Sequence, residues 1–197
     1  MIWGMHAIHT TPGFIIDSRP YGEAGKMISI FTRDFGLVSA VAQGIRLEKS
    51  KLRYFAQDYS LGIFSLVRGK ELWRLTSAQD GPLVAEGKDS LEILARVSLL
   101  LRRLLQGEEP HPELFDLVES LAAFLKGNAA LSAEEMRALE SLSVFRMLDL
   151  LGYIGDDSSL AEFAGRGQFT REILGQAAVK RAALNQHINK ALKESHL

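Results

Sequence analysis

Cysteine is absent from this chain of 197 residues. That absence excludes disulfide bonds, thiolate metal sites and cysteine nucleophiles. The chain also lacks a run of about 18 apolar residues, so no membrane-spanning helix is expected. No lysine or arginine precedes Arg19, and the first residues do not resemble a signal peptide. We therefore expect a cytoplasmic protein, associated with the nucleoid if it binds DNA.

The net charge of −1 conceals a marked segregation of charge along the chain. Residues 1–80 carry a net charge of +3, residues 81–165 carry −8, and residues 166–197 carry +4. Such a pattern is typical of a polyanion-binding end beside an acidic body, although excesses of this size also arise by chance.

The first 80 residues are rich in short runs of Ile, Val, Phe, Thr and Leu, each bounded by Gly, Pro, Asp or Arg. The runs predict five strands over His6–Asp17, Lys26–Arg33, Leu37–Gly44, Tyr59–Val67 and Glu71–Ala78. Five short strands in so few residues favour a small closed barrel, because closure removes exposed edges. Periodicity alone does not separate an OB barrel from an SH3-like barrel.

Beyond Asp80-Gly81-Pro82 the apolar residues recur at the spacing of helices. Helices are predicted over Ser90–Gln106, Pro112–Lys126, a segment from Ser132 to Leu151, and Thr170–Lys193. Ser132 and Glu135 have the spacing of a capping box. The fold class predicted is α+β in two domains, with a barrel over 1–80, a linker over 81–88 and a helical domain over 89–197.

No arrangement of residues indicates catalysis. Gly25-Lys26 lacks the remainder of a phosphate loop, and Gly165-Arg166-Gly167 lacks the third glycine of a dinucleotide site. The five histidines do not have the spacing of helical metal ligands, and the adjacent acid pairs suit capping and solvation. We expect no enzyme activity, no cofactor and no metal site.

The most informative stretch is Ser18–Arg53, where basic residues alternate with aromatic ones. Proteins that bind single-stranded DNA need cations along the phosphates and rings on which bases stack. The candidate phosphate-binding residues are Arg19, Arg33, Arg46, Lys49, Lys51 and Arg53. Tyr21 and Phe35 lie in predicted loops and are the candidate stacking residues. The cluster Arg46–Arg53 is either a phosphate-binding arm or an ordinary solvated loop.

Three motifs in this chain resemble a known family. They are SRPYGEAGKMISIFT at 18–32 followed by Gly36, AVAQGIRLEKSKLR at 40–53, and Leu150-Leu151-Gly152-Tyr153. Together they resemble RecO, the bacterial recombination mediator. The chain departs from the family pattern at Gly25, where an acid is usual, and at Gln43, where lysine is usual. It also lacks the cysteines with which many members bind zinc.

The resemblance implies an OB-fold domain that binds single-stranded and duplex DNA, followed by a helical domain. It implies annealing of complementary strands and, together with RecR, loading of RecA onto strands coated by single-strand DNA-binding protein. The competing interpretation is a barrel-and-helix scaffold for protein interactions that has no nucleic-acid role.

The family's partner tail is acidic and ends in an aromatic residue, which calls for an apolar pocket rimmed by cations. In the helical half, Arg146, Lys180 and Arg181 are the candidate rim residues. The alternative is that all three are solvated charges on helix surfaces.

Overall fold

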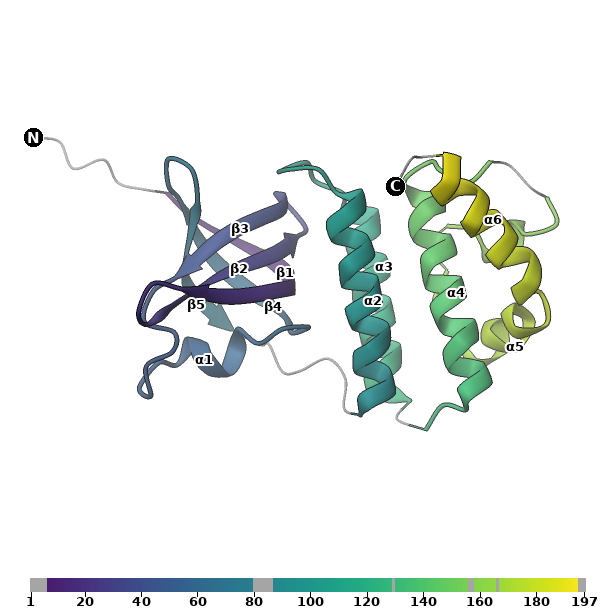
Figure 1. Ribbon diagram of the computed structural model, residues 1–197, viewed down its shortest axis with the longest axis horizontal. Helices are drawn as coiled ribbons and strands as arrows, with labels where there is room; N and C mark the ends of the chain where they lie inside the picture. The colour runs from purple at the N-terminus through teal and green to yellow at the C-terminus, as the bar shows by residue number, and fades with distance from the viewer. Residues whose placement is uncertain (1–6, 80–86, 129, 156–157, 166, 195–197) are drawn as a thin grey trace, which may run out of the picture. The chain divides into compact units, whose positions relative to one another are not determined.

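A computed structural model describes residues 7–79, 87–128, 130–155, 158–165 and 167–194. The chain divides into two compact units, one built on β-strands and the other on helices (Figure 1). No helix among the described residues is long and apolar enough to cross a membrane.

The first unit is a closed barrel of five strands in the order β1-β2-β3-β5-β4. The strands are β1 (Ile8–Tyr21), β2 (Gly25–Thr32), β3 (Gly36–Ala42), β4 (Leu61–Arg68) and β5 (Trp73–Gln79). Neighbours pair in antiparallel fashion, except that β3 and β5 run parallel where the barrel closes. This order is that of an OB fold, so the predicted five-stranded OB barrel is confirmed.

Alternating side chains from the strands fill the barrel, as the period-2 pattern requires. Ile28, Ile30, Val38 and Phe64 are fully buried in this core. The prediction was wrong about the end of the first strand. After an irregularity in register between Ile15 and Asp17, β1 continues to Tyr21, which is therefore a strand residue and not a loop residue.

The segment Leu105–Pro112 belongs to the barrel unit although it follows a helix of the other unit. The Trp73 indole Nε1 donates to Glu108 Oε1 over 2.8 Å, and Arg68 pairs with the same carboxylate at 2.9 Å. The backbone N–H of Leu37 donates to the carbonyl of Gly107. A Cβ atom on Gly36 would lie 2.1 Å from the carbonyl oxygen of Glu109, so this close approach requires glycine. The sequence-based division had placed this segment in the helical domain.

Replacing Glu108 with alanine is expected to destabilise the barrel, because the buried Trp73 indole would lose its acceptor. The expected cost is about 1–3 kcal/mol. Urea unfolding followed by fluorescence measures it, in a Trp3→Phe background so that Trp73 alone reports. Glu108→Gln keeps an oxygen acceptor and is expected to retain most of the stability. A Glu108→Ala protein as stable as the parent would contradict the assignment.

The second unit contains five α-helices and one short 3-10 helix in the described residues. They are α2 (Lys88–Leu104), α3 (Pro112–Gly127), α4 (Ala133–Leu150), η1 (Ala161–Phe163), α5 (Arg171–Val179) and α6 (Arg181–Glu194). The capping box at the start of α4 is present, with Ser132 and Glu135 bonded reciprocally. Most of the predicted linker over 81–88 lies outside the described residues, and α2 begins at its last position.

The predicted single helix over Thr170–Lys193 is in fact two helices, α5 and α6, separated at Lys180. The apolar pattern does not reveal the break. Leu174 and Ala177 are buried before it, and Leu184 and Ile188 are buried after it, with no change in spacing. Lys180 instead forms contacts with the preceding loop, where its ammonium group donates to the carbonyl of Ser159 over 2.9 Å.

Candidate nucleic-acid interface

The predicted basic cluster lies in the loop between β3 and β4, residues 43–60, which contains the one-turn helix α1 (Leu52–Phe55). The loop is packed on the barrel through its apolar residues. Ile45 and Ala56 are buried in the barrel core, and Leu52 packs against it. The Ser60 hydroxyl donates to the carbonyls of Phe55 and Gln57 and fixes the end of α1.

Ile45, Leu52 and Ala56 are directed inward, whereas the cations of the loop are exposed. The exposed cations are Arg46, Lys49, Lys51 and Arg53. Glu48 is the acid that lies among them. Four positive charges on a fixed loop create a local positive potential that attracts phosphate groups.

The loop is attached to the turn between β1 and β2. The Arg46 backbone N–H donates to the carbonyl of Ala24 over 3.0 Å, and the Arg46 guanidinium donates to that of Glu23 over 3.3 Å. Arg19 and Tyr21 lie at the end of β1, just before this turn, and both are exposed. Six of the eight predicted DNA-binding residues therefore belong to this loop and the adjoining hairpin.

The other two, Arg33 and Phe35, lie in the turn between β2 and β3, at the opposite end of β2. At 3.3 Å per residue the length of β2 separates the two ends by about 23 Å. The Phe35 ring also packs against His9 and Trp73, each with a centroid distance of 5.2 Å. Phe35 thus contributes to the barrel's own packing, and the structure does not bring it beside the basic loop.

Two aromatic residues of the loop were not among the predicted site residues. The Tyr54 side chain is 61% exposed and that of Phe55 is 37% exposed. Both belong to α1, in which Leu52 faces the barrel, as does Ala56 just after the helix. Both rings lie between the predicted strands Leu37–Gly44 and Tyr59–Val67, so the loop position that selected Tyr21 and Phe35 applied to them as well.

The three predicted rim residues of the helical unit do not form one rim. Arg146 is 1% exposed, and its guanidinium lies 4.9 Å from the centroid of the Phe169 ring. It donates to the carbonyl of Phe163 over 3.0 Å and to that of Gly167. Burial lowers the pKa of Arg146. The role of this residue is to hold the loop after α4, because its charge is enclosed by backbone carbonyls and a ring.

Lys180 and Arg181 are adjacent in sequence but have different surroundings. The Lys180 ammonium group pairs with Glu162 at 2.8 Å. Arg181 lines a groove of about 460 Å³ bounded by residues of α2, α4 and α6. The apolar residues lining this groove are Leu100, Val144, Ile188 and Leu192.

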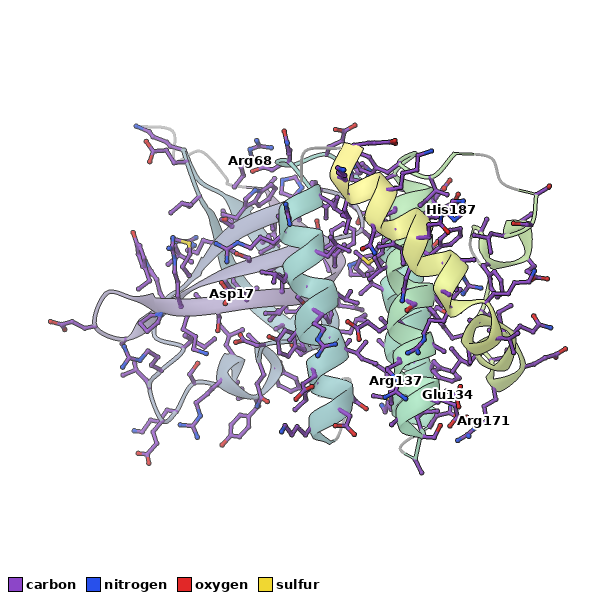
Figure 2. All side chains as sticks on the ribbon, turned by 45° about the vertical axis from the view of Figure 1, so that its right-hand side comes forward. Asp17, Arg68, Glu134, Arg137, Arg171 and His187 are labelled. Atoms are coloured by element: carbon purple, nitrogen blue, oxygen red, sulfur yellow. The ribbon has the colours of Figure 1, made fainter. Side chains whose placement is uncertain are left out.

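Three arginines, Arg96, Arg137 and Arg181, line the same groove. Arg96 is bound to Glu140 over 2.6 Å, whereas neither of the other two has a carboxylate partner in the described part of the chain. Arg137 lies in the first turns of α4, near Glu134 and Arg171 (Figure 2). The groove thus combines an apolar lining with two arginines, Arg137 and Arg181, that form no ion pair with a described residue.

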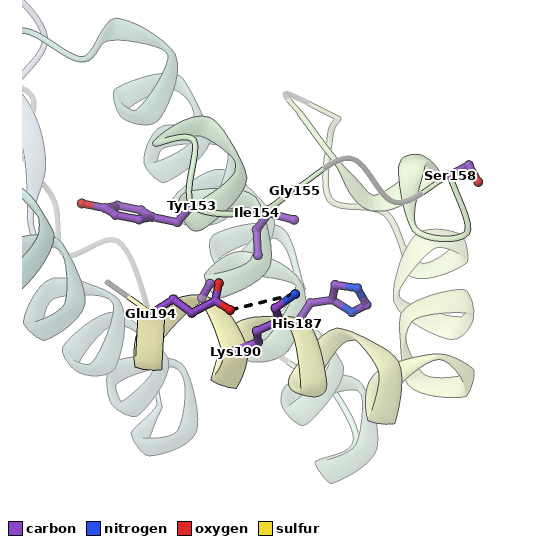
Figure 3. A pocket seen from close by; sticks show the side chains of 8 residues that line it. Tyr153, Ile154, Gly155, Ser158, His187, Lys190 and Glu194 are labelled. Carbon is purple, nitrogen blue, oxygen red and sulfur yellow. Dashed lines mark ion pairs between the residues drawn. The ribbon is translucent and has the colours of Figure 1, made fainter. Parts of the chain in front are cut away.

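A second pocket, of about 410 Å³, is lined by other residues of α6 and by the loop after α4 (Figure 3). Here Lys190 lies 4.0 Å from Glu194, so the cation has a neutralising partner. His187 contacts the carbonyl of Ala183 through Nδ1. This pocket is polar, and its lysine is already paired. It is therefore a weaker binding site for an acidic ligand than the groove.

Comparison with known proteins identifies the family. Residues 5–80, which contain all five strands and the basic loop, match the family described as "Recombination protein O N terminal". The chain belongs to the RecO family. It is 34% identical over 132 residues to the DNA repair protein RecO of Alkalilimnicola ehrlichii, covering 66% of this chain and 53% of the relative.

Two further RecO relatives align over more of the chain. The DNA repair protein RecO of Desulfitobacterium hafniense (strain DSM 10664 / DCB-2) is 30% identical over 165 residues, or 82% of this chain and 57% of the relative. That of Rubrobacter xylanophilus is 31% identical over 163 residues, or 81% of this chain and 63% of the relative. The chain thus spans between about half and two thirds of the length of these RecO proteins.

Proposed function

We propose that this RecO-family protein acts in DNA repair and recombination as a non-enzymatic mediator that binds single-stranded DNA. The observation that carries the proposal is the loop over residues 43–60, anchored by buried apolar residues and presenting four exposed cations. Because the loop is already folded, ordering it on DNA costs little conformational entropy. A fixed row of cations beside exposed rings suits a single strand, whose phosphates and bases are both accessible.

The proposal extends to the activities that the RecO resemblance implies. These are annealing of complementary strands and, with RecR, loading of RecA onto strands coated by single-strand DNA-binding protein. None of these roles requires a catalytic group, because each consists of bringing strands and proteins together.

The direct test measures binding of the full chain to a single-stranded oligonucleotide over a range of salt concentrations. Each phosphate contact on a single strand contributes about 0.7 to the slope of log affinity against log salt. Contacts from the five cations of the loop and β1 predict a slope of roughly −3 to −4. Absence of binding, or binding that does not depend on salt, would favour the protein-interaction scaffold.

We further propose that the groove lined by α2, α4 and α6 receives the acidic tail of single-strand DNA-binding protein. An aromatic residue at the end of such a tail would pack on Leu100, Val144 and Ile188. Arg137 and Arg181 would pair with its carboxylates. Of the three rim residues predicted from sequence, this proposal retains Arg181 alone.

Arg181→Glu is expected to weaken binding of an acidic tail peptide about tenfold or more, because one attractive charge becomes repulsive. Lys190→Glu is the matched control, since it makes the same charge change on the same helix but lines the other pocket. Fluorescence anisotropy of a labelled peptide measures both. Equal affinities for the two variants would exclude the groove as the site.

A further inference from the structure

Tyr54 and Phe55 present large rings to solvent from a loop that is otherwise well packed. Leu47, in the same loop, is exposed as well. Burying an aromatic side chain stabilises a fold by about 1.5–3 kcal/mol. Tyr54, which is 61% exposed, forgoes most of that gain, and Phe55 forgoes part of it. An exposed group of apolar side chains beside a row of cations is a feature of ligand-binding surfaces.

The backbone that carries Tyr54 is held in place by its surroundings. The Tyr54 backbone N–H donates to the carbonyl of Lys51, and the residues on either side of the helix turn, Leu52 and Ala56, pack on the barrel core. The guanidinium carbon of Arg53 lies 5.5 Å from the centroid of the Tyr54 ring. A charge that can meet a phosphate thus lies beside an exposed aromatic ring.

We propose that Tyr54 stacks on an unpaired nucleobase and that it makes the loop prefer single-stranded over duplex DNA. The proposal rests on the DNA binding proposed above. Cations of the loop meet phosphates equally well on either form of DNA, so they do not discriminate. In a duplex each base is already stacked on its neighbours, and only a single strand can offer a free base face to the ring.

The test compares Tyr54→Ala with Tyr54→Phe in the full chain, using a single-stranded oligonucleotide and a duplex of the same length. Loss of one base–ring stack costs about fivefold to a hundredfold in affinity. We expect that loss for Tyr54→Ala on the single strand, no change on the duplex, and parental affinity for Tyr54→Phe. Tyr153→Ala, an exposed tyrosine of the helical unit, is the matched control.

A second variant, Tyr54→Trp, reports stacking through its fluorescence, so this test does not depend on a loss of affinity. Stacking of a base on the new indole is expected to quench its fluorescence when the single strand binds and not when the duplex binds.

The proposal is overturned if Tyr54→Ala binds the single strand as tightly as the parent, or weakens single strand and duplex equally. Either result leaves DNA binding itself in place, because that depends on the cations. Failure of the cation variants to affect binding would instead overturn the proposed function.

Discussion

Replacing Arg46, Lys49, Lys51 and Arg53 together with alanine is expected to reduce affinity for single-stranded DNA by roughly several hundredfold near 0.1 M salt. The figure follows from counterion release, which contributes about fivefold per phosphate contact at that salt concentration. The salt slope should become shallower by about 3. All four side chains are exposed, so the barrel core is unaffected. Fluorescence anisotropy over a salt series measures both quantities.

The control for this variant removes the same charge from the helical unit. Lys88, Lys126, Lys190 and Lys193 are replaced by alanine, which changes the net charge of the protein equally. This control is expected to keep the parental slope. If the two variants lost affinity to the same extent, the effect would reflect net charge and the loop would not be the binding site.

Arg146→Ala is expected to destabilise the helical unit by about 3–5 kcal/mol. The change leaves a cavity where a large buried side chain stood and removes the donors that satisfy the carbonyls of Phe163 and Gly167. Thermal unfolding followed by circular dichroism at the helix band measures the effect, with an expected fall in Tm of roughly 10 °C.

Arg137→Ala on the same helix is the comparison for Arg146. Arg137 is exposed, so its replacement is expected to change the free energy of unfolding by no more than about 0.5 kcal/mol. If Arg146→Ala unfolded at the temperature of Arg137→Ala, Arg146 would not have the structural role assigned here.

Local sequence patterns predicted the strands and most of the helices well. They predicted poorly which residues of those elements lie close together in the fold. Short runs of Ile, Val, Phe, Thr and Leu identified all five strands, and Ser132 with Glu135 identified the start of α4. The antiparallel pairing of β2 with β3 places Arg33 and Arg46 at opposite ends of β2, and this pairing was not used when the site residues were chosen. A stretch that is continuous in sequence was therefore treated as one surface.

Sequence patterns also could not predict that a charged side chain, that of Arg146, is buried. Arg146 resembles any helix-surface arginine until the loop after α4 folds over it and provides carbonyl acceptors. The break at Lys180 escaped detection for a related reason. The helix ends where a lysine reaches a loop carbonyl and Glu162, which are distant in sequence.

The segment Leu105–Pro112 has a consequence for the order in which the protein folds. During synthesis the five strands emerge first, but the carbonyl that pairs with Leu37 and the carboxylate that receives the Trp73 indole follow only after the 17 residues of α2. The barrel therefore completes its hydrogen bonding after part of the helical unit has left the ribosome. In a chain stalled on the ribosome just beyond β5, the backbone amide of Leu37 is expected to exchange its hydrogen readily. In a chain stalled well beyond α3, the same amide is expected to be protected from exchange.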